Sequence, residues 1–261
     1  HQRLAFITVA LTVGLGAGLT IALSDGSSKV GGVPAVVLCA GAAFAINWLA
    51  FVPSYLKRTE HYFDLVGSLT HLTLIFVALV GTSDLDLRAI VVSVLVGVWA
   101  VRLGSFLFLR AKQAGGDGRF DTIKHHPGTF FSWWSLQALW VLVTGSCSLA
   151  VITSMERQSF GWFAGAGLAL WGAGFLIEIV ADRQKTQFRS ESRNSGSFIQ
   201  SGLWAWSRHP NYFGEILLWI GIAVVAIPLL SGWRWVALIS PIFVFVLLTC
   251  ISGIPILERR A

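Results

Sequence analysis

Long apolar runs separated by short polar stretches dominate the pattern of this chain. A helix rises about 1.5 Å per residue and a bilayer core is about 30 Å thick, so about 18 or more apolar residues can cross it. Eight runs meet that length: residues 4–23, 33–56, 61–80, 88–109, 129–152, 159–180, 212–230 and 233–255. The run 61–80 is the weakest, because it contains Asp64 and two histidines. The runs are continuously apolar rather than alternating, which argues against a transmembrane β-barrel. The pattern therefore predicts an all-α, polytopic integral membrane helical bundle of about seven or eight transmembrane helices.

Composition agrees with that prediction. The 261 residues are 55% hydrophobic and only 12% charged, whereas a soluble domain carries about 25% charged residues. Half the usual charge leaves too little polar surface to cover a water-soluble globule, so a soluble enzyme is excluded.

Lysine and arginine are distributed unevenly between the two sides of the membrane. If the chain crosses eight times, residues 57–60, 110–128, 181–211 and both termini share one side, which carries fourteen of the nineteen cations. The positive-inside rule places that side in the cytoplasm. We therefore expect a protein of a bacterial inner membrane with both termini and its polar loops facing the cytoplasm. The net charge of +6 has the same origin, and no stacking-aromatic pattern or motif indicates a nucleic acid partner.

Ionisable residues inside apolar runs indicate where function is to be sought, because each costs about 2.5–3.5 kcal/mol on insertion. Five such residues lie in or directly after an apolar run, near the expected cytoplasmic ends of their helices: Asp64, Arg102, Glu178, Asp182 and Glu215. We expect them to form one polar pocket in the inner half of the bilayer, open to the cytoplasm. The alternative is that the acids are structural partners of a buried cation.

The stretch from residue 178 to residue 193 combines acids with cations. Glu178 and Asp182 are four residues apart and therefore share a helix face, and Lys185, Arg189 and Arg193 follow. Carboxylates accept hydrogen bonds from ribose hydroxyls or an amide, and arginines bind phosphate oxygens in a fork. A nucleotide cofactor fits this combination. The alternative is a solvated basic loop.

The stretch "RAKQAGGDGRFDTIKHHPG", residues 110–128, adds Arg110, Asp117 and Arg119 to the candidate cofactor residues. It contains no G-x-G-x-x-G after a strand and no P-loop, so no soluble nucleotide-binding fold is indicated. Its adjacent histidines, His125 and His126, have no third ligand at a matching spacing, and we expect no metal site.

The stretch "SRHPNYFGEILLW", residues 207–219, carries hydrogen-bonding side chains directly to the start of an apolar run. Its candidates for cofactor binding are Arg208, His209, Asn211, Tyr212 and Glu215, and Trp204 precedes them. So much polar chemistry at the edge of an uncharged segment predicts the wall of a ligand site.

These residues carry a family resemblance over roughly residues 95 to 258. "EIVADRQKTQFR" followed by "SGLWAWSRHPNYFGEILLWIG" resembles the C-terminal half of the membrane steroid 5-alpha-reductase family, and "RLGSFLFLR" with "GGDGRF" resembles its DUF1295 branch. Sterol C14- and C7-reductases share a similar "RHPNY" element. Isoprenylcysteine methyltransferases also carry "RHPxY".

The resemblance implies that NADPH binds between helices of this half. It implies cofactor roles for Glu178, Asp182 and Arg189, and it matches Asn211 and Glu215 to the family's N-x-x-G-E motif. Arg208, His209 and Tyr212 match the sterol-reductase version of the motif. It also implies a single transmembrane domain over residues 1–261, with variable N-terminal helices in 1–94 and a cofactor-binding half in 95–261.

The N-terminal half departs from the family pattern. Steroid 5-alpha-reductases carry a Gln-Glu pair and a catalytic tyrosine, whereas here Phe63-Asp64 falls at the pair and Trp99 at the tyrosine. We therefore assign the acid role to Asp64, with Tyr62 as a neighbouring proton source.

The function implied is NADPH-dependent reduction of an activated C=C bond in a lipophilic substrate, steroid-, sterol- or isoprenoid-like, by an oxidoreductase acting on CH–CH groups. The substrate would enter from the surrounding membrane lipids. Two alternatives stay open. One is a methyltransferase of the isoprenylcysteine type that uses S-adenosylmethionine, and the other is a non-enzymatic lipid-binding or transport protein.

Overall fold

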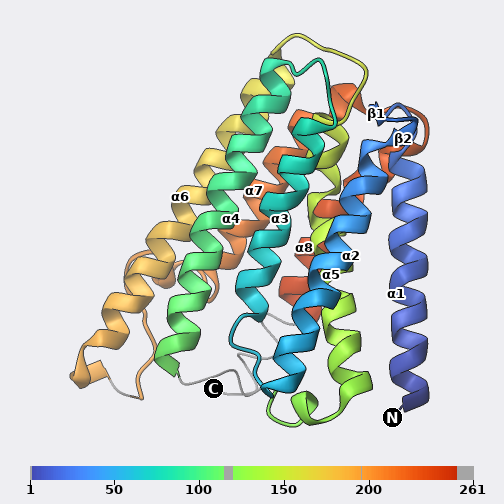
Figure 1. Cartoon of the computed structure of the whole chain (residues 1–261). Coiled ribbons are helices and arrows are strands. Elements are labelled where there is room, and N and C mark those ends of the chain that lie inside the picture. Colours follow the sequence, from blue (N-terminus) through green and yellow to red (C-terminus); the bar gives the residue numbers. More distant parts are fainter. Residues whose placement is uncertain (1, 115–119, 195, 252–261) are drawn as a thin grey trace. The chain divides into compact units, whose positions relative to one another are not determined.

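The computed structural model describes residues 2–114, 120–194 and 196–251. Within them, eight helical segments are long and apolar enough to cross a membrane, which confirms the all-α prediction. The main helices are α1 (Gln2–Leu23), α2 (Ala35–Leu56), α3 (Phe63–Val80), α4 (Leu87–Ala114), α5 (Pro127–Ile152), α6 (Trp162–Ser190), α7 (Pro210–Ala226) and α8 (Ile239–Val246) (Figure 1).

Shorter elements connect them. A small antiparallel hairpin pairs β1 (Lys29–Val30) with β2 (Val33–Pro34). Single-turn elements are η2 (Ile123–His125), η3 (Ser192–Asn194), η4 (Gly202–Ala205) and η5 (Ile227–Leu229). The eighth span, Gly232–Ile251, consists of the 3₁₀ segment η6 (Gly232–Leu238), α8 and a π-helical turn, η7 (Leu247–Ile251).

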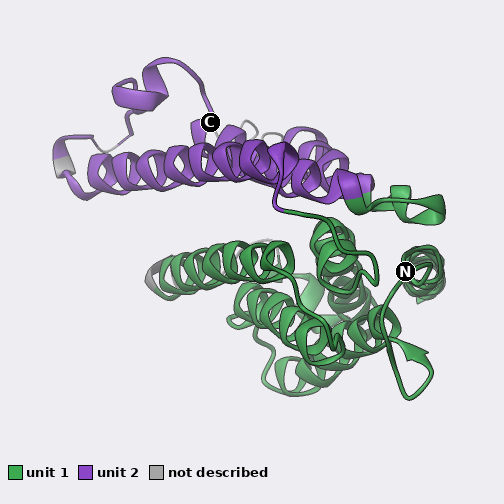
Figure 2. Ribbon diagram, turned by 90° about the horizontal axis from the view of Figure 1, so that it is seen from above, with its two compact units in different colours: residues 1–159, 229–237 green, residues 160–228, 238–261 purple. Residues whose placement is uncertain are grey.

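The chain forms two compact units (Figure 2). Unit 1 comprises His1–Ser159 and Leu229–Ala237, and unit 2 comprises Phe160–Pro228 and Leu238–Ala261. The expected division of a single domain at residue 94 concerns function rather than compactness, and it stays a prediction.

In unit 1, α5 is the central helix. It lies against α1, α2, α3 and α4, and residues 141–154 are buried without interruption. At its other end an aromatic cluster joins α3, α5 and the segment before η2: Phe63, Phe120, Phe130 and Trp134. Outward-facing side chains of the neighbouring helices are large and apolar, as expected for helices in contact with lipid.

Two arginines of unit 1, Arg88 and Arg234, are buried. Arg234 donates to the carbonyl oxygens of Gly26 and Ala150 and to the Ser154 hydroxyl. Arg88 donates to the Ser159 carbonyl oxygen at 2.6 Å. Both guanidinium groups therefore hold connections of unit 1 together by donating to backbone oxygens of segments far apart in the sequence.

Unit 2 is built on the antiparallel pair α6 and α7, with α8 against α7. Glycines bring the two backbones into contact. A methyl group added to Gly174 would lie 2.5 Å from the Gly214 carbonyl oxygen, and one added to Gly167 would lie 2.5 Å from that of Gly221. Small residues at such spacings are typical of closely packed membrane helices.

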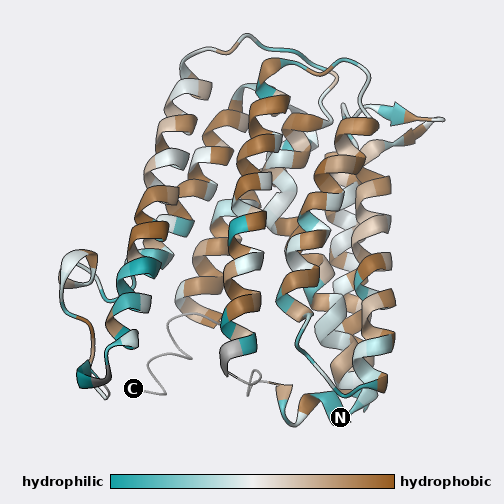
Figure 3. Ribbon diagram, turned by 60° about the vertical axis from the view of Figure 1, so that its left-hand side comes forward, coloured by the Kyte–Doolittle hydropathy of each residue, from teal (hydrophilic) through white to brown (hydrophobic). Residues whose placement is uncertain are grey.

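Two helix ends differ from the sequence prediction. Helix α6 continues to Ser190, ten residues past the apolar run, and α4 continues to Ala114, so residues 181–190 and 110–114 are helical rather than loop. The reason is that the apolar run marks where a helix leaves the hydrocarbon, whereas residues such as Ala, Gln, Lys and Arg continue a helix in water. Figure 3 shows hydrophobic residues along most of the helix lengths and hydrophilic residues gathered toward helix ends.

Candidate functional site

The polar end of the α6–α7 pair gathers the densest group of predicted residues. Glu178 and Asp182 are buried, with exposed fractions of 3% and 8%. Asn211, in the first turn of α7, donates its side-chain amide to Asp182 Oδ1 at 3.2 Å. Glu178 lies against the Gly214 backbone, where a methyl group would meet the Glu178 nitrogen at 2.8 Å. The glycine contact therefore places two acids of α6 next to the start of α7.

The side-chain oxygen of Asn211 differs from its amide nitrogen, which bonds to Asp182. The oxygen, Oδ1, is buried, and no residue in the described ranges donates a hydrogen bond to it. A buried acceptor without a donor costs about 1–3 kcal/mol. Such an atom indicates either strain or a ligand that supplies the missing donor. The group comprising Glu178, Asp182 and Asn211 is here called the acid–amide cluster.

The η4 turn borders this cluster. Trp204 donates its indole N–H to the Ala181 carbonyl oxygen at 3.0 Å, and the Leu203 amide donates to Gln184 Oε1 at 3.0 Å. The Lys185 ammonium lies 4.7 Å from the centre of the Trp204 ring, a cation–π distance. Gly202 allows the turn, because its φ of +60° is a conformation that other residues rarely adopt. Trp204 is thus fixed against the side of α6.

The "RHPNY" residues lie around the N-terminus of α7. The His209 and Tyr212 rings stack with centroids 5.4 Å apart and an interplanar angle of 12°. The Ser207 hydroxyl accepts a hydrogen bond from the His209 amide. Arg208 is exposed, and Glu215 is half-buried one turn into the helix.

The cations on the polar extension of α6 are exposed. Arg189 lies in its last turn. Arg193 is already engaged by Glu191 through a 2.6 Å ion pair. Arg189 is therefore the better candidate of the two to bind an anionic ligand.

The candidates in unit 1 lie on α3 and α4. Asp64 is half-buried in the first turn of α3, and Tyr62, about half exposed, stacks on Phe108 with centroids 6.3 Å apart. The Arg102 and Arg110 guanidinium groups lie over the same ring, that of Phe106, at 5.5 and 5.9 Å.

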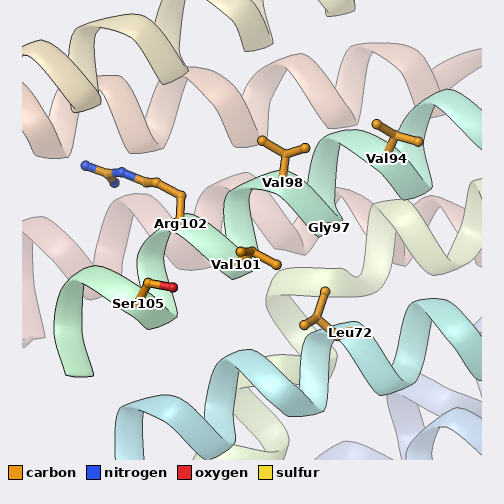
Figure 4. A pocket seen from close by; sticks show the side chains of 7 residues that line it. All are labelled: Leu72, Val94, Gly97, Val98, Val101, Arg102 and Ser105. Atoms are coloured by element: carbon orange, nitrogen blue, oxygen red, sulfur yellow. The ribbon is translucent and has the colours of Figure 1, made fainter. Parts of the chain in front are cut away.

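Arg102 also lines an open, mostly apolar groove of about 540 Å³ on α3 and α4 (Figure 4). The other lining residues are Leu72, Val94, Gly97, Val98, Val101 and Ser105.

The positions that correspond to the family's catalytic residues are mostly core. Phe63 belongs to the buried aromatic cluster, and Trp99 is buried with its ring edge-to-face on His71 at 5.1 Å. Of Phe63, Asp64 and Trp99, only Asp64 has an ionisable side chain, and it is half-buried.

The predicted residues therefore divide between the two units, with Asp64, Tyr62, Arg102 and Arg110 in unit 1 and the remaining described candidates in unit 2. Asp117 and Arg119 lie outside the described residues. The structure brings the acid–amide cluster together, and the single pocket expected from all five membrane-embedded ionisable residues stays a prediction.

A buried polar network in unit 1 escaped the sequence analysis. Gln137 of α5 donates to Asn47 Oδ1 of α2 at 3.0 Å and to the Phe63 carbonyl oxygen of α3 at 2.9 Å. Asn47 in turn donates to Thr70 Oγ1 at 3.3 Å. These side chains are uncharged, so the pattern of ionisable residues did not select them. Their presence in apolar runs was the available signal, since each must find a hydrogen-bond partner.

Lys124 links two connections at the end of unit 1. Its ammonium bonds Glu60 Oε2 at 3.2 Å and Asp121 Oδ1 at 3.3 Å. Burial by itself lowers the pKa of Lys124, but the hydrogen bonds and charges of Glu60 and Asp121 outweigh it and raise the pKa above its usual value. The link fixes the segment that leads into Tyr62 and Asp64.

In the parts of the chain that the structure describes, no three histidine, cysteine or acidic side chains are grouped as metal ligands would be. The candidate site thus consists of acids, amides, cations and aromatic rings.

Comparison with known proteins adds a family and a distant likeness. A family model described as "Protein of unknown function (DUF1295)" matches residues 50–261. Proteins named steroid 5-alpha-reductase DET2 are 31% identical over 100 residues in Gossypium hirsutum and 29% identical over 96 residues in Arabidopsis thaliana. These matches cover 38% and 37% of this chain, and 34% and 32% of the relatives, so only about a third of each relative is matched. No solved structure matches.

Proposed function

The chain belongs to the DUF1295 family, and from this premise we propose that it is a membrane-embedded, NADPH-dependent reductase of an activated C=C bond in a lipophilic substrate. The observation that carries the proposal is the acid–amide cluster, which sits at the polar end of two membrane-spanning helices and includes a buried acceptor, Asn211 Oδ1, that lacks a donor among the described residues. The partial similarity to steroid 5-alpha-reductases supports the reaction class.

The residues present fit a dinucleotide. Asn211 Oδ1 can accept from a ribose hydroxyl or a carboxamide N–H, and the Asp182 carboxylate, oriented by Asn211, can accept a second such bond. Arg189 and Arg208 are exposed cations of the same unit, suited to phosphate oxygens. When bound, NADPH supplies the hydride, while the protein supplies position and electrostatics.

We infer that Asp64 supplies the proton. Asp64 lies in the first turn of α3 with the Tyr62 hydroxyl two residues before it. The Asp64 carboxyl group would donate a proton to one carbon of the C=C bond, while the hydride is added to the other carbon. Tyr62, about half exposed, would return a proton from water to Asp64. The substrate, a steroid-, sterol- or isoprenoid-like molecule, would approach through the lipid.

Thermal unfolding of the detergent-purified protein tests the cofactor. NADPH is expected to raise the melting temperature, because a ligand that binds only the folded state stabilises it. Arg189→Ala is expected to remove most of that rise, since a charge-assisted bond is worth about 1.5–3 kcal/mol, or roughly ten- to a hundredfold in affinity. Arg193→Ala is the matched control: it removes an exposed cation that Glu191 already engages, and should leave the rise in place.

Two other results decide against the proposal. A rise with S-adenosylmethionine and none with NADPH would favour a methyltransferase of the isoprenylcysteine type. No rise with either would favour a non-enzymatic lipid-binding protein.

The orientation completes the proposal: the polar ends of α6 and α7 face the cytoplasm. The excess of Lys and Arg in the segments on that side supports it. In a Cys250→Ser background, Thr122→Cys and Ser190→Cys, both exposed positions, should react with a membrane-impermeant maleimide only after the membrane is opened. Labelling of intact cells at either position would overturn the orientation.

A further inference from the structure

Two tryptophans of one short turn have opposite surroundings. Trp204 is 9% exposed and donates its indole N–H to the Ala181 carbonyl oxygen. Trp206, two residues later, is 92% exposed. The segment Gly202–Trp206, which carries both, is here called the tryptophan turn.

The contacts of Trp204 show which residues of α6 the tryptophan turn lies beside. The apolar part of α6 ends at Val180, and the residues from Asp182 to Lys185 are charged or polar. Ala181 therefore lies where α6 leaves the hydrocarbon. The tryptophan turn is tied there twice, through Trp204 to Ala181 and through the Leu203 amide to Gln184. Because Trp206 follows directly, it lies at the boundary between hydrocarbon and water.

A tryptophan at that boundary has a preferred environment. Its large apolar ring is costly to leave in water, while its N–H needs an acceptor, and the head-group region of a bilayer satisfies both. Arg183 and Arg208 are exposed on either side of the turn in the chain, and cations near the surface attract the phosphates of lipid head groups.

We propose that the tryptophan turn rests on the membrane surface and that Trp206 inserts among the phospholipid head groups as an anchor. The inward-facing Trp204 then holds the same turn against α6 through its hydrogen bond to Ala181, the residue that precedes Asp182. Lipid contact on one side and the Trp204 hydrogen bond on the other would thus keep the segment between α6 and α7 folded beside the acid–amide cluster. This anchoring role does not depend on the proposed reaction.

Collision measurements on a spin label test the anchor in lipid nanodiscs. The background variant is Cys250→Ser, because Cys250 is exposed whereas Cys39 and Cys147 are buried. One label is placed through Ala205→Cys, an exposed position within the turn, and the reference label through Ser190→Cys. Ser190 lies nine residues beyond Ala181 on α6, about 14 Å further into water.

Oxygen concentrates in lipid and a nickel chelate stays in water, so the ratio of their collision rates reports depth. The label at position 205 is expected to show a severalfold higher oxygen-to-chelate ratio than the label at 190. Adding Trp206→Ser should lower the ratio at 205 severalfold, while Trp206→Phe, which keeps an apolar ring, should retain it.

Three results would overturn the proposal. Equal chelate access at 205 and 190 would place the turn in water. Low access at 205 to both reagents would mean that protein, not lipid, covers it. A ratio unaffected by Trp206→Ser would show that Trp206 is not the anchor. Because Trp206 is almost fully exposed, the melting temperature in detergent of each variant should match that of its parent, which separates loss of anchoring from loss of folding.

Discussion

The two units use their polar residues in opposite ways. In unit 1, Asn47, Thr70 and Gln137 lie buried between helices and bond to one another and to the backbone. In unit 2, glycines bring the α6 and α7 backbones into contact, and the polar side chains gather at one end, where Asn211 Oδ1 lacks a donor among the described residues. The difference lies in what the polar groups contact. The unit 1 amides bond to neighbouring helices and hold them together, although Gln137 Oε1 also lacks a partner among the described residues. The unsatisfied oxygen of unit 2 lies instead at the polar end of a helix pair, where a ligand can supply the donor.

The largest expected effect separates proton donation from cofactor binding. Asp64→Asn removes an acid of unit 1 with little change in volume, so turnover should fall about 10²- to 10⁴-fold, the usual contribution of a general acid. The NADPH-induced rise in melting temperature, which depends on unit 2, should persist. Steady-state kinetics measure the loss of turnover, and melting curves measure the effect of NADPH. Full activity of the variant would make Asp64 a structural residue.

The next effect tests backbone contact in unit 2. Gly174→Ala would place a methyl group 2.5 Å from the Gly214 carbonyl oxygen, forcing α6 and α7 apart at a cost of about 3 kcal/mol. Gly172→Ala is the matched control on the same helix. Its added methyl group would meet nothing within 4 Å, so it should stabilise slightly through helix propensity. Chemical unfolding in detergent measures both, and equal effects would remove the glycine contact as an explanation.

A smaller effect tests the amide network of unit 1. Gln137→Leu leaves Asn47 Oδ1 and the Phe63 carbonyl oxygen without this donor, and should lower the free energy of unfolding by about 1–3 kcal/mol. Adding Asn47→Leu should cost less than the sum of the two single changes, because the partners are then lost together. Strict additivity in the double-mutant cycle would mean that the two amides act independently.

The smallest effect concerns Lys124. Its folded-state pKa is raised above the usual value, so its contribution to stability is complete below about pH 10.5 and is lost as pH rises through the folded pKa. Lys124→Met should therefore destabilise by no more than about 1 kcal/mol at neutral pH, with the difference from wild type shrinking in strong alkali. Lys57→Met is the control, because it removes the same charge from an exposed side chain. A gap in melting temperature that is constant with pH would contradict the assignment.

The members of the acid–amide cluster could be selected from the sequence, but their arrangement could not. The resemblance and the polar pattern selected Glu178, Asp182 and Asn211, and the structure joins Asp182 to Asn211 across 29 positions. No pattern indicated that Asn211 would keep an unsatisfied oxygen, or that Trp204 would be fixed to Ala181 while Trp206 stays exposed. These outcomes depend on how the η4 turn and α7 pack on α6.

The sequence by itself determined the membrane class and the eight spans, because hydrocarbon thickness and the rise of a helix translate directly into the length of an apolar run. Only the tertiary structure decided which residues meet. Gly174 touches Gly214 and Gln137 bonds to Asn47 over separations of 40 and 90 positions, and hydropathy carries no information on such pairs. The physical reason is that transfer into lipid depends on each residue alone, whereas a hydrogen bond or a backbone contact depends on the partner that folding brings to it.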